Sequence, residues 1–272
     1  MTSNLSQKTS NLTVIIPTKN SERFLPKCLE SVKSCRQVIV VDSNSKDKTK
    51  SIVNTYGRVY VNFEWNKKYP KKRAWALDKL LIESDWILML DSDECISDEF
   101  LREFDNRITK SNHNGFWIHY NNYFMNKLMR YGVSQKKLAL IRKNHGTYED
   151  FGENDWTEYD MEIHEHIIVD GTVGKMNTKL SHLQNESYEQ MLDKHFEYAK
   201  WEAKRYASFS IKSSSTLREK IKYHLINKFF FSYVYFFFQY FVLLGFLDGF
   251  EGYKYAKIKF KYFKRVYELL RK

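Results

Sequence analysis

The chain is poor in proline, glycine and cysteine. It has 3 Pro and 10 Gly in 272 residues, and it shows no low-complexity linker or internal repeat. This favours one large domain, or one domain with an appendage, over a string of linked modules. The three cysteines, Cys28, Cys35 and Cys95, form neither a CxxC pair nor a metal-ligand spacing. Their odd number indicates reduced, buried thiols and argues against a disulfide framework.

The N-terminal stretch 1–11 is polar and lacks the apolar segment of a secretory signal. We therefore expect a short disordered lead-in to a cytoplasmic protein. An excess of one charge is also lacking over most of the chain. From Ala203 onward there are 15 Lys and Arg against 4 Asp and Glu, whereas the remainder has 29 of each. The net charge of +11 thus belongs to the C-terminal quarter, which predicts a polyanionic partner there.

Short apolar, β-branched runs alternate with helical patterns in the first part of the chain. They predict buried strands and intervening helices, which is typical of an α/β fold with a mostly parallel, Rossmann-like sheet covered by helices on both faces. The expected strands are Leu12–Ile16, Gln37–Val41, Val59–Phe63 and Trp86–Leu90. The expected helices are one that Ser21 caps and that runs through Leu25, Leu29 and Val32, one from about Asp47 to Tyr56, and one from Lys71 to Ile82 with Ala74, Leu77 and Leu81 on one face.

Beyond this region the order is less regular. Gly115–Tyr120 and Lys137–Arg142 are expected strands, and Ser187–Phe209 is an expected amphipathic helix. Polar clusters follow three of the N-terminal strands, at Thr18, Asp42 and Asp91. Active sites of such sheets lie beyond the carboxyl ends of the strands, so we expect these clusters to meet.

Asp91-Ser92-Asp93 directly follows a buried strand. Two carboxylates one residue apart can reach one divalent cation, and Mn²⁺ or Mg²⁺ often combines such oxygens with substrate phosphates. The alternative is a solvated loop, or a cap for the helix that contains Phe100. Asp42 can likewise accept hydrogen bonds from a base or ribose, or it can simply form a turn. No GxGxxG motif is present, which disfavours a dinucleotide-binding domain.

Four ordered segments resemble the landmarks of family 2 glycosyltransferases with the GT-A fold. They are Ile15–Asn20 (IIPTKN), Val41–Thr49 (VDSNSKDKT), Lys72–Ala76 (KRAWA) and Leu90–Glu94 (LDSDE). The resemblance covers about residues 12 to 185. Two shorter segments, Ile163–Glu165 (IHE) and Leu180–His182 (LSH), further resemble the lipopolysaccharide-core glucosyltransferase branch.

The resemblance implies inverting transfer of a sugar from a nucleotide-diphosphate sugar, commonly a UDP-sugar, to an acceptor hydroxyl. Asp93 would be the direct metal ligand, with Asp91 touching ribose or metal and His182 completing the metal shell. The residues that it places around the donor nucleotide are Pro17, Thr18, Asn20, Asp42, Ser43, Arg73, Asp91 and Ser92.

The acceptor hydroxyl needs a base to take its proton. Many family members use an Asp of a Glu-Asp pair, and Glu149-Asp150 is such a pair, although it lies close to Asp93 in the sequence. His164-Glu165 occupies the slot used by the lipopolysaccharide-core branch. We expect Glu165 to be the base, with Asp150 as the alternative. The triplet formed with His166 is not HExxH, so a zinc hydrolase is disfavoured.

The C-terminal region contains 19 consecutive uncharged residues, Phe229–Leu247. This length borders on a bilayer span, but the run is aromatic and basic on both flanks, which disfavours a single crossing. We expect a re-entrant or in-plane hairpin with Gly245, Gly249 and Gly252 near its turn, bound to an anionic membrane. The alternative is an ordinary buried helix.

The sequence thus predicts a lead-in at 1–11, a GT-A domain at 12–210 and a helical membrane-associating region at 211–272. The expected partners are a nucleotide-sugar donor, a glycan or glycolipid acceptor and the inner face of the cytoplasmic membrane. Nucleic acid is disfavoured, because the basic residues flank an apolar run and form no aromatic-studded groove. Two alternatives are a polyprenyl-phosphate sugar synthase and a non-catalytic GT-A scaffold that binds membranes.

Overall fold

The structure is a computed structural model that describes residues 10–150, 166–209 and 217–271. Within these residues the chain forms two compact units. The first comprises the described residues of Met1–Asn121, Gln135–Glu153 and Asp160–Leu183, and the second comprises those of Asn122–Ser134 and Gln184–Lys272. Most of the expected lead-in and the expected boundary near residue 210 lie outside the described residues, whereas Ser10 and Asn11 already belong to the first strand.

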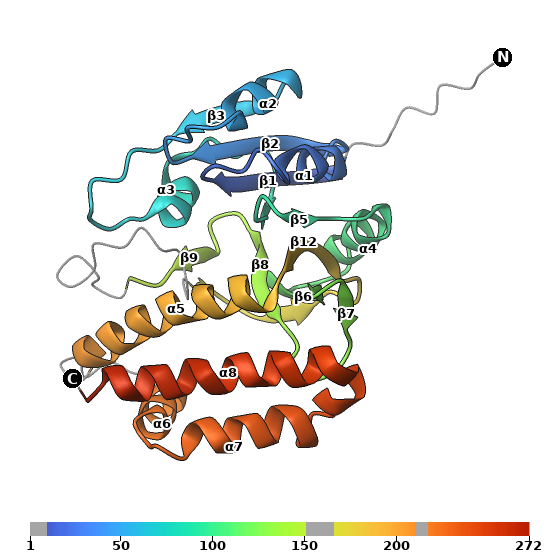
Figure 1. Cartoon of the computed structure of the whole chain (residues 1–272). Helices are drawn as coiled ribbons and strands as arrows, with labels where there is room; N and C mark the ends of the chain where they lie inside the picture. Colours follow the sequence, from blue (N-terminus) through green and yellow to red (C-terminus); the bar gives the residue numbers. More distant parts are fainter. Residues whose placement is uncertain (1–9, 151–165, 210–216, 272) are drawn as a thin grey trace. The chain divides into compact units, whose positions relative to one another are not determined.

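Four parallel strands form one half of the sheet in the first unit, in the order β3-β2-β1-β4. Figure 1 shows β3, β2 and β1 in this order. Each successive strand is reached through a helix, which is the connection that parallel neighbours require. The strands are β1 (Ser10–Thr18), β2 (Cys35–Asp42), β3 (Val59–Asn62) and β4 (Trp86–Met89), and the helices are α1 (Leu25–Ser31), α2 (Thr49–Thr55) and α3 (Lys72–Lys79). All four predicted strands are confirmed, to within a few residues at their ends.

Helices cover both faces of this half, as predicted. Successive side chains of a strand point to opposite faces. Val14 and Ile16 of β1 therefore join a core cluster with residues of α1 and α4 (Asp98–Ile108). Ile15 instead joins a second cluster with Ala74 and Ala76 of α3.

The sheet beyond β4 is mixed, so the prediction of a mostly parallel sheet is wrong there. β8 (Lys136–Arg142) is antiparallel to β4, and β6 (Gly115–Phe124) is antiparallel to β8. The chain passes from β6 to β8 through the short β7 (Lys127–Met129) with no intervening helix, so these strands cannot be parallel neighbours. The remaining strands are β5 (Glu94–Cys95), β9 (Gly146–Tyr148), β10 (Ile167–Val169), β11 (Val173–Lys175) and β12 (Leu180–Glu186).

Two helix ends differ from expectation. α1 begins at Leu25 with Phe24 at its N-cap, so Ser21 does not cap it. α3 ends at Lys79, which leaves Leu81 beyond the helix and 84% exposed.

The helix that contains Phe100 is α4. It is capped by the Ser97 hydroxyl, which accepts a hydrogen bond from the Phe100 N–H. Asp91–Glu94 therefore does not serve as that cap.

The second unit is built around two long helices, α5 (Tyr188–Phe209) and α8 (Gly249–Leu269), that pack against each other. α7 (Phe231–Phe237) runs along α8 (Figure 1). The shorter elements of this unit are α6 (Leu217–Ile226), a π-helical turn η2 (Phe238–Val242) and a 3₁₀ turn η3 (Gly245–Asp248).

The aromatic run of the C-terminal region is helical, as predicted. Among the described residues, no individual helix combines the length and apolar composition needed to cross a bilayer. The pair Phe231–Val242 and Gly245–Leu269, bent by 71°, satisfies those two criteria only when it is taken together.

Candidate active site

The polar ends of β1 and β2 lie side by side, as the sequence predicted. Asn20 and Ser45 hold the two following loops together: the Asn20 N–H donates to Ser45 Oγ at 2.7 Å, and the Lys46 N–H donates to Asn20 Oδ1 at 2.9 Å. β1 has β2 on one side and β4 on the other, so the chain reverses its direction of winding at β1. Ligand crevices of α/β sheets form at such a point.

Asp42 is fully buried at the end of β2 and acts as an acceptor for this loop region. Its carboxylate receives hydrogen bonds from the Thr18 hydroxyl at 2.8 Å, the Ser45 N–H at 2.8 Å and the Tyr60 hydroxyl at 2.9 Å, and also from the Ser45 hydroxyl. Burial and the Asp42 contact raise the pKa of Tyr60 to about 12. A carboxylate has about four acceptor positions, and these donors occupy them. Asp42 therefore shapes the loop, and its direct contact with a nucleotide stays a prediction.

Two consecutive cations stand at the start of α3. The Lys72 ammonium is buried and donates to the Thr18 carbonyl and to the Ser43 hydroxyl, both at 3.0 Å. Arg73 extends in another direction and pairs with Asp91. Pro17 is buried within β1, opposite Val41. The nucleotide-binding roles predicted for Pro17, Thr18, Asn20, Ser43, Arg73 and Ser92 stay predictions, although the structure gathers these residues at one edge of the sheet.

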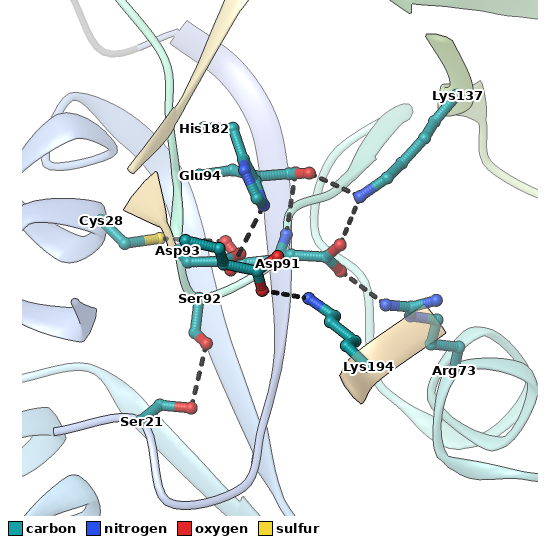
Figure 2. A network of polar contacts seen from close by, with 11 residues as sticks. Ser21, Cys28, Arg73, Asp91, Ser92, Asp93, Glu94, Lys137, His182 and Lys194 are labelled. Carbon is teal, nitrogen blue, oxygen red and sulfur yellow. Dashed lines mark hydrogen bonds and ion pairs between the residues drawn. The ribbon is translucent and has the colours of Figure 1, made fainter. Parts of the chain in front are cut away.

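Asp91 follows β4 and is held between two cations (Figure 2). Arg73 Nη2 lies 2.6 Å from one carboxylate oxygen, and the Lys137 ammonium contacts the other. Burial alone would raise the pKa of the Asp91 carboxyl, but the charges of Arg73 and Lys137 hold it well below its usual range. Asp91 is therefore ionised and neutralised within the protein.

Glu94 completes this network from the far side of the same turn. Its side chain is 1% exposed, accepts the Asp91 N–H at 3.1 Å and lies 2.5 Å from the Lys137 ammonium. Burial, followed by the charge of Asp91, raises the pKa of Glu94 to about 7. The sequence analysis assigns no role to Lys137, and it includes Glu94 only as the last residue of the LDSDE segment.

Asp93 and His182 form a separate pair beside this network. β12 runs antiparallel to β5 with His182 opposite Glu94, and the Leu183 N–H donates to the Asp93 carbonyl at 2.6 Å. His182 Nε2 consequently lies 3.3 Å from Asp93 Oδ2 (Figure 2). Burial lowers the pKa of His182, but its hydrogen bond to Asp93 outweighs this effect and raises the pKa overall. Both side chains keep some solvent exposure, 17% for Asp93 and 25% for His182.

This pair fits the predicted divalent cation, because a carboxylate oxygen and an imidazole nitrogen are both ligands of Mn²⁺-type ions. In the described part of the chain, no three His, Cys, Asp or Glu side chains converge to form a complete protein-only site. Asp91 is committed to Arg73 and Lys137. The protein would therefore offer two ligands, Asp93 and His182, and leave the other positions to water and substrate phosphates.

The predicted catalytic bases are less well placed by the structure. Asp150 is exposed and ends the described segment that follows β9. Glu165 and His164 lie outside the described residues, so their assignment stays a prediction.

Comparison with known proteins agrees with the resemblance seen in the sequence. The model of Glycosyl transferase family 2 matches residues 13–161 of this chain. The lipopolysaccharide core biosynthesis glycosyltransferase LpsC of Rhizobium meliloti is 27% identical over 179 residues, which cover 61% of this chain and 60% of LpsC. An uncharacterized glycosyltransferase of Rickettsia prowazekii is 26% identical over 202 residues, covering 71% of this chain and 67% of that protein.

Among solved structures, S. aureus TarS 1-349 matches with a TM-score of 0.44 and 19% identity, covering 96% of this chain and 91% of that one. The family match spans more than half of the chain and includes the strand ends that carry Thr18, Asp42, Asp91 and Asp93. The chain therefore belongs to glycosyl transferase family 2, as its sequence motifs predicted.

Proposed function

We propose that the protein transfers a sugar, with inversion, from a UDP-sugar to a hydroxyl of a lipopolysaccharide-core or other lipid-linked glycan, in a reaction that requires Mn²⁺ or Mg²⁺. The observation that carries this proposal is the Asp93–His182 pair, 3.3 Å apart, next to the cations Arg73 and Lys137 at the end of β4. The relative named for lipopolysaccharide core biosynthesis supports the class of acceptor.

The departing nucleoside diphosphate gains negative charge as the sugar leaves it. A divalent cation held by Asp93 and His182 would neutralise part of that charge as a Lewis acid. Arg73 and Lys137 lie at the same edge of the sheet, and Asp91 cancels one of their two positive charges while it fixes their positions by pairing with both. Preorganised charges of this kind stabilise a transition state without rearrangement during the reaction.

The acceptor oxygen attacks the anomeric carbon in line with the departing diphosphate, and a base removes its proton. We propose Glu165 for this role, with Asp150 as the alternative and His164 beside the base. The Glu165→Gln variant should retain donor binding and lose sugar transfer, whereas Asp150→Asn should retain both. The opposite pattern would assign the base to Asp150.

The proposal is tested by nucleotide release over a panel of nucleotide-sugars with Mn²⁺, with Mg²⁺ and with EDTA. We expect slow hydrolysis of one UDP-sugar, lost with EDTA and reduced about 100-fold or more in Asp93→Ala, since a metal clamp contributes several kcal/mol and 1.4 kcal/mol is a factor of ten. Asp85→Ala is the matched control, because Asp85 is an exposed carboxylate at the opposite end of the same strand.

Equal turnover in Asp93→Ala and Asp85→Ala would contradict the metal assignment. If no nucleotide-sugar is turned over, a direct titration of donor binding follows. Absence of both turnover and binding would favour the non-catalytic scaffold. We further propose that the enzyme works at the inner face of the cytoplasmic membrane, where a lipid-linked acceptor would be available.

A further inference from the structure

The second unit displays an unusually apolar surface. In the described part of the chain, thirteen of the twenty-one exposed large apolar side chains lie between Phe229 and Tyr253. Single exposed apolar residues are normal on a protein surface, but a contiguous patch marks a contact with another molecule or with a membrane. We refer to the segment Phe229–Tyr253 as the aromatic hairpin.

The exposed side chains follow the helical period. α7 and the η2 turn after it expose pairs of residues at a spacing of four, which places all of them along one side. These residues are Tyr233, Val234, Phe237, Phe238, Phe241 and Val242, each between 45% and 59% exposed. A side chain on this stripe meets solvent in the structure, and every member of the stripe is apolar or aromatic.

The opposite side of the hairpin packs on α8. The Phe231 and Phe263 rings have centroids 4.9 Å apart, and those of Tyr240 and Tyr253 are 6.0 Å apart. We call Phe231–Val242 the first arm and α8, which continues beyond the hairpin, the second arm. As residue numbers rise along the first arm, the numbers of their partners on α8 fall, so the two arms are antiparallel. The apolar content of the segment is thus divided between an inner side packed on α8 and an outer side that stays about half exposed, although Tyr233 at the start of the stripe also contacts Phe260 of α8, with ring centroids 4.9 Å apart.

The turn of the hairpin is fixed by polar contacts within its own unit. The Gly132 N–H donates to the Leu243 carbonyl at 2.9 Å, and Asp248 accepts the Arg130 and Tyr131 N–H groups. Gly252 allows the turn to close, because a Cβ at that position would lie 2.0 Å from the Gly245 carbonyl oxygen. The exposed stripe therefore leads directly into a turn that is anchored by backbone contacts.

Cations border the apolar side chains of the turn. The Lys257 ammonium lies 5.6 Å from the centre of the Tyr253 ring. The Lys254 ammonium lies 5.1 Å from the centre of the Phe250 ring, but it is closer, at 4.5 Å, to the Tyr188 ring of α5. No Asp or Glu occurs in Phe229–Leu247. Aromatic side chains next to lysines are characteristic of helices that lie in the headgroup region of anionic membranes.

The dimensions exclude a crossing by the first arm. Phe231–Val242 has twelve residues, which reach about 18 Å as a helix, whereas the hydrocarbon core of a bilayer is about 30 Å thick. The second arm contains several lysines in its middle, among them Lys257 and Lys261. The arms therefore suit the plane of the interface better than its normal.

We propose that the aromatic hairpin inserts its outer stripe into the interface of an anionic phospholipid bilayer, parallel to the membrane surface, and that Lys257 contacts lipid phosphates. This surface does not depend on the sugar-transfer reaction. The Asp93→Ala variant should therefore bind vesicles as the wild type does, so that failure of one proposal leaves the other open.

The full-length protein would be sedimented with preformed vesicles of phosphatidylcholine, with and without phosphatidylglycerol. We expect binding that requires phosphatidylglycerol and weakens with added salt. The Phe237→Ser/Phe241→Ser double variant should bind at least about tenfold more weakly, because two aromatic rings that would be buried in the interface are lost. Leu81→Ser is the matched control, since Leu81 is 84% exposed in the first unit.

Three results would overturn the proposal: no binding of the wild type to either vesicle, equal loss of binding in Leu81→Ser and the double variant, or binding unaffected by the double variant. Light scattering of the protein in solution tests the alternative that a second copy of the chain, and not lipid, covers the stripe. If the wild type is a dimer that the double variant disperses, and the vesicles are not bound, the stripe is covered by a second copy of the chain.

Discussion

The two units distribute their polar and apolar side chains in opposite ways. In the first unit, uncharged strands such as β4 are buried completely, and charged groups gather where the strands end. In the second unit, the longest uncharged run forms an exposed surface, while His195, Glu202 and Arg205 are buried among the helices. An apolar run therefore predicts burial only when both of its sides find a partner.

The difference follows from geometry. A strand inside a sheet with helices on both faces is enclosed on every side, so each of its side chains loses contact with water. A helix at the edge of a bundle has one enclosed side, and whatever lies on its other side stays exposed. In α7 that other side is as apolar as the inner one, which is why the run resembles a core segment in the sequence.

The largest expected effect contrasts two apolar truncations. Leu88→Ala removes a fully buried side chain of β4 and should lower the free energy of unfolding by about 2–5 kcal/mol, because it leaves a cavity. Phe237→Ala removes an aromatic ring that is 58% exposed and should change it by less than about 0.5 kcal/mol. Urea unfolding followed by circular dichroism measures both. A large loss for Phe237→Ala would mean that the outer stripe is covered in solution.

A second effect concerns the buried polar interior of the second unit. His195 is 8% exposed, its Nδ1 lies 2.8 Å from the Met191 carbonyl, and its Nε2 lies 2.7 Å from the Lys259 ammonium. The pKa of His195 is lowered from 6.5 to about 3. The largest cause is burial, followed by the charge of Lys259 and, with a smaller effect, that of Lys194. The unfolded chain thus binds a proton between pH 6.5 and 3 that the folded chain does not bind.

Stability should therefore fall as the pH drops through this window, by roughly 2 kcal/mol between pH 7 and pH 5 from His195 alone. The His195→Gln variant, which cannot ionise, should lose about that much less in urea unfolding at the two pH values. Glu94 in the first unit contributes to the pH dependence of stability with the opposite sign. Its raised pKa of about 7 means that acidification below neutral pH favours the folded state. Equal pH dependence in wild type and His195→Gln would show that the pKa of His195 is not lowered by folding.

The smallest effect tests the loop acceptor of the first unit. Tyr60→Phe removes one of the hydrogen bonds to Asp42 and should lower the free energy of unfolding by about 1 kcal/mol. Donor affinity, measured by titration calorimetry, should be nearly unchanged, because Thr18 and Ser45 still hold the carboxylate. An affinity loss of about tenfold without a loss of stability would indicate direct contact between this pair and the nucleotide.

Much of the first unit was predictable. Its strands are β-branched apolar runs, and the polar residues that follow these runs indicate the site. The proximity of Thr18, Asn20 and Asp42 was predictable, because the carboxyl ends of parallel strands lie at the same edge of the sheet. That hydrogen bonds from its neighbours fill the acceptor positions of Asp42 was not predictable, since one of these bonds comes from the Tyr60 hydroxyl of the adjacent strand β3.

Lys137 was missed for a specific reason. β8 is antiparallel to β4 with Leu140 opposite Leu88, and the same register continued for three residues brings Lys137 opposite Asp91. The sequence indicates a strand at Lys137–Arg142 but not its direction, so it does not show that the first residue of this strand lies at the carboxyl end of β4. The signal was present in the sequence, as a lysine at the start of an apolar run, but only the strand direction gives it meaning.

The packing of Phe124 has a practical consequence for anyone who wishes to shorten the protein. Phe124 is fully buried in a cluster with Tyr255 and Ile258, which follow it by more than a hundred residues. A truncated protein that ended before residue 210 would lack Tyr255 and Ile258. The Phe124 ring would then lose its packing partners and become exposed to water. Expression trials should therefore keep the last helix and remove stickiness by surface substitutions on α7.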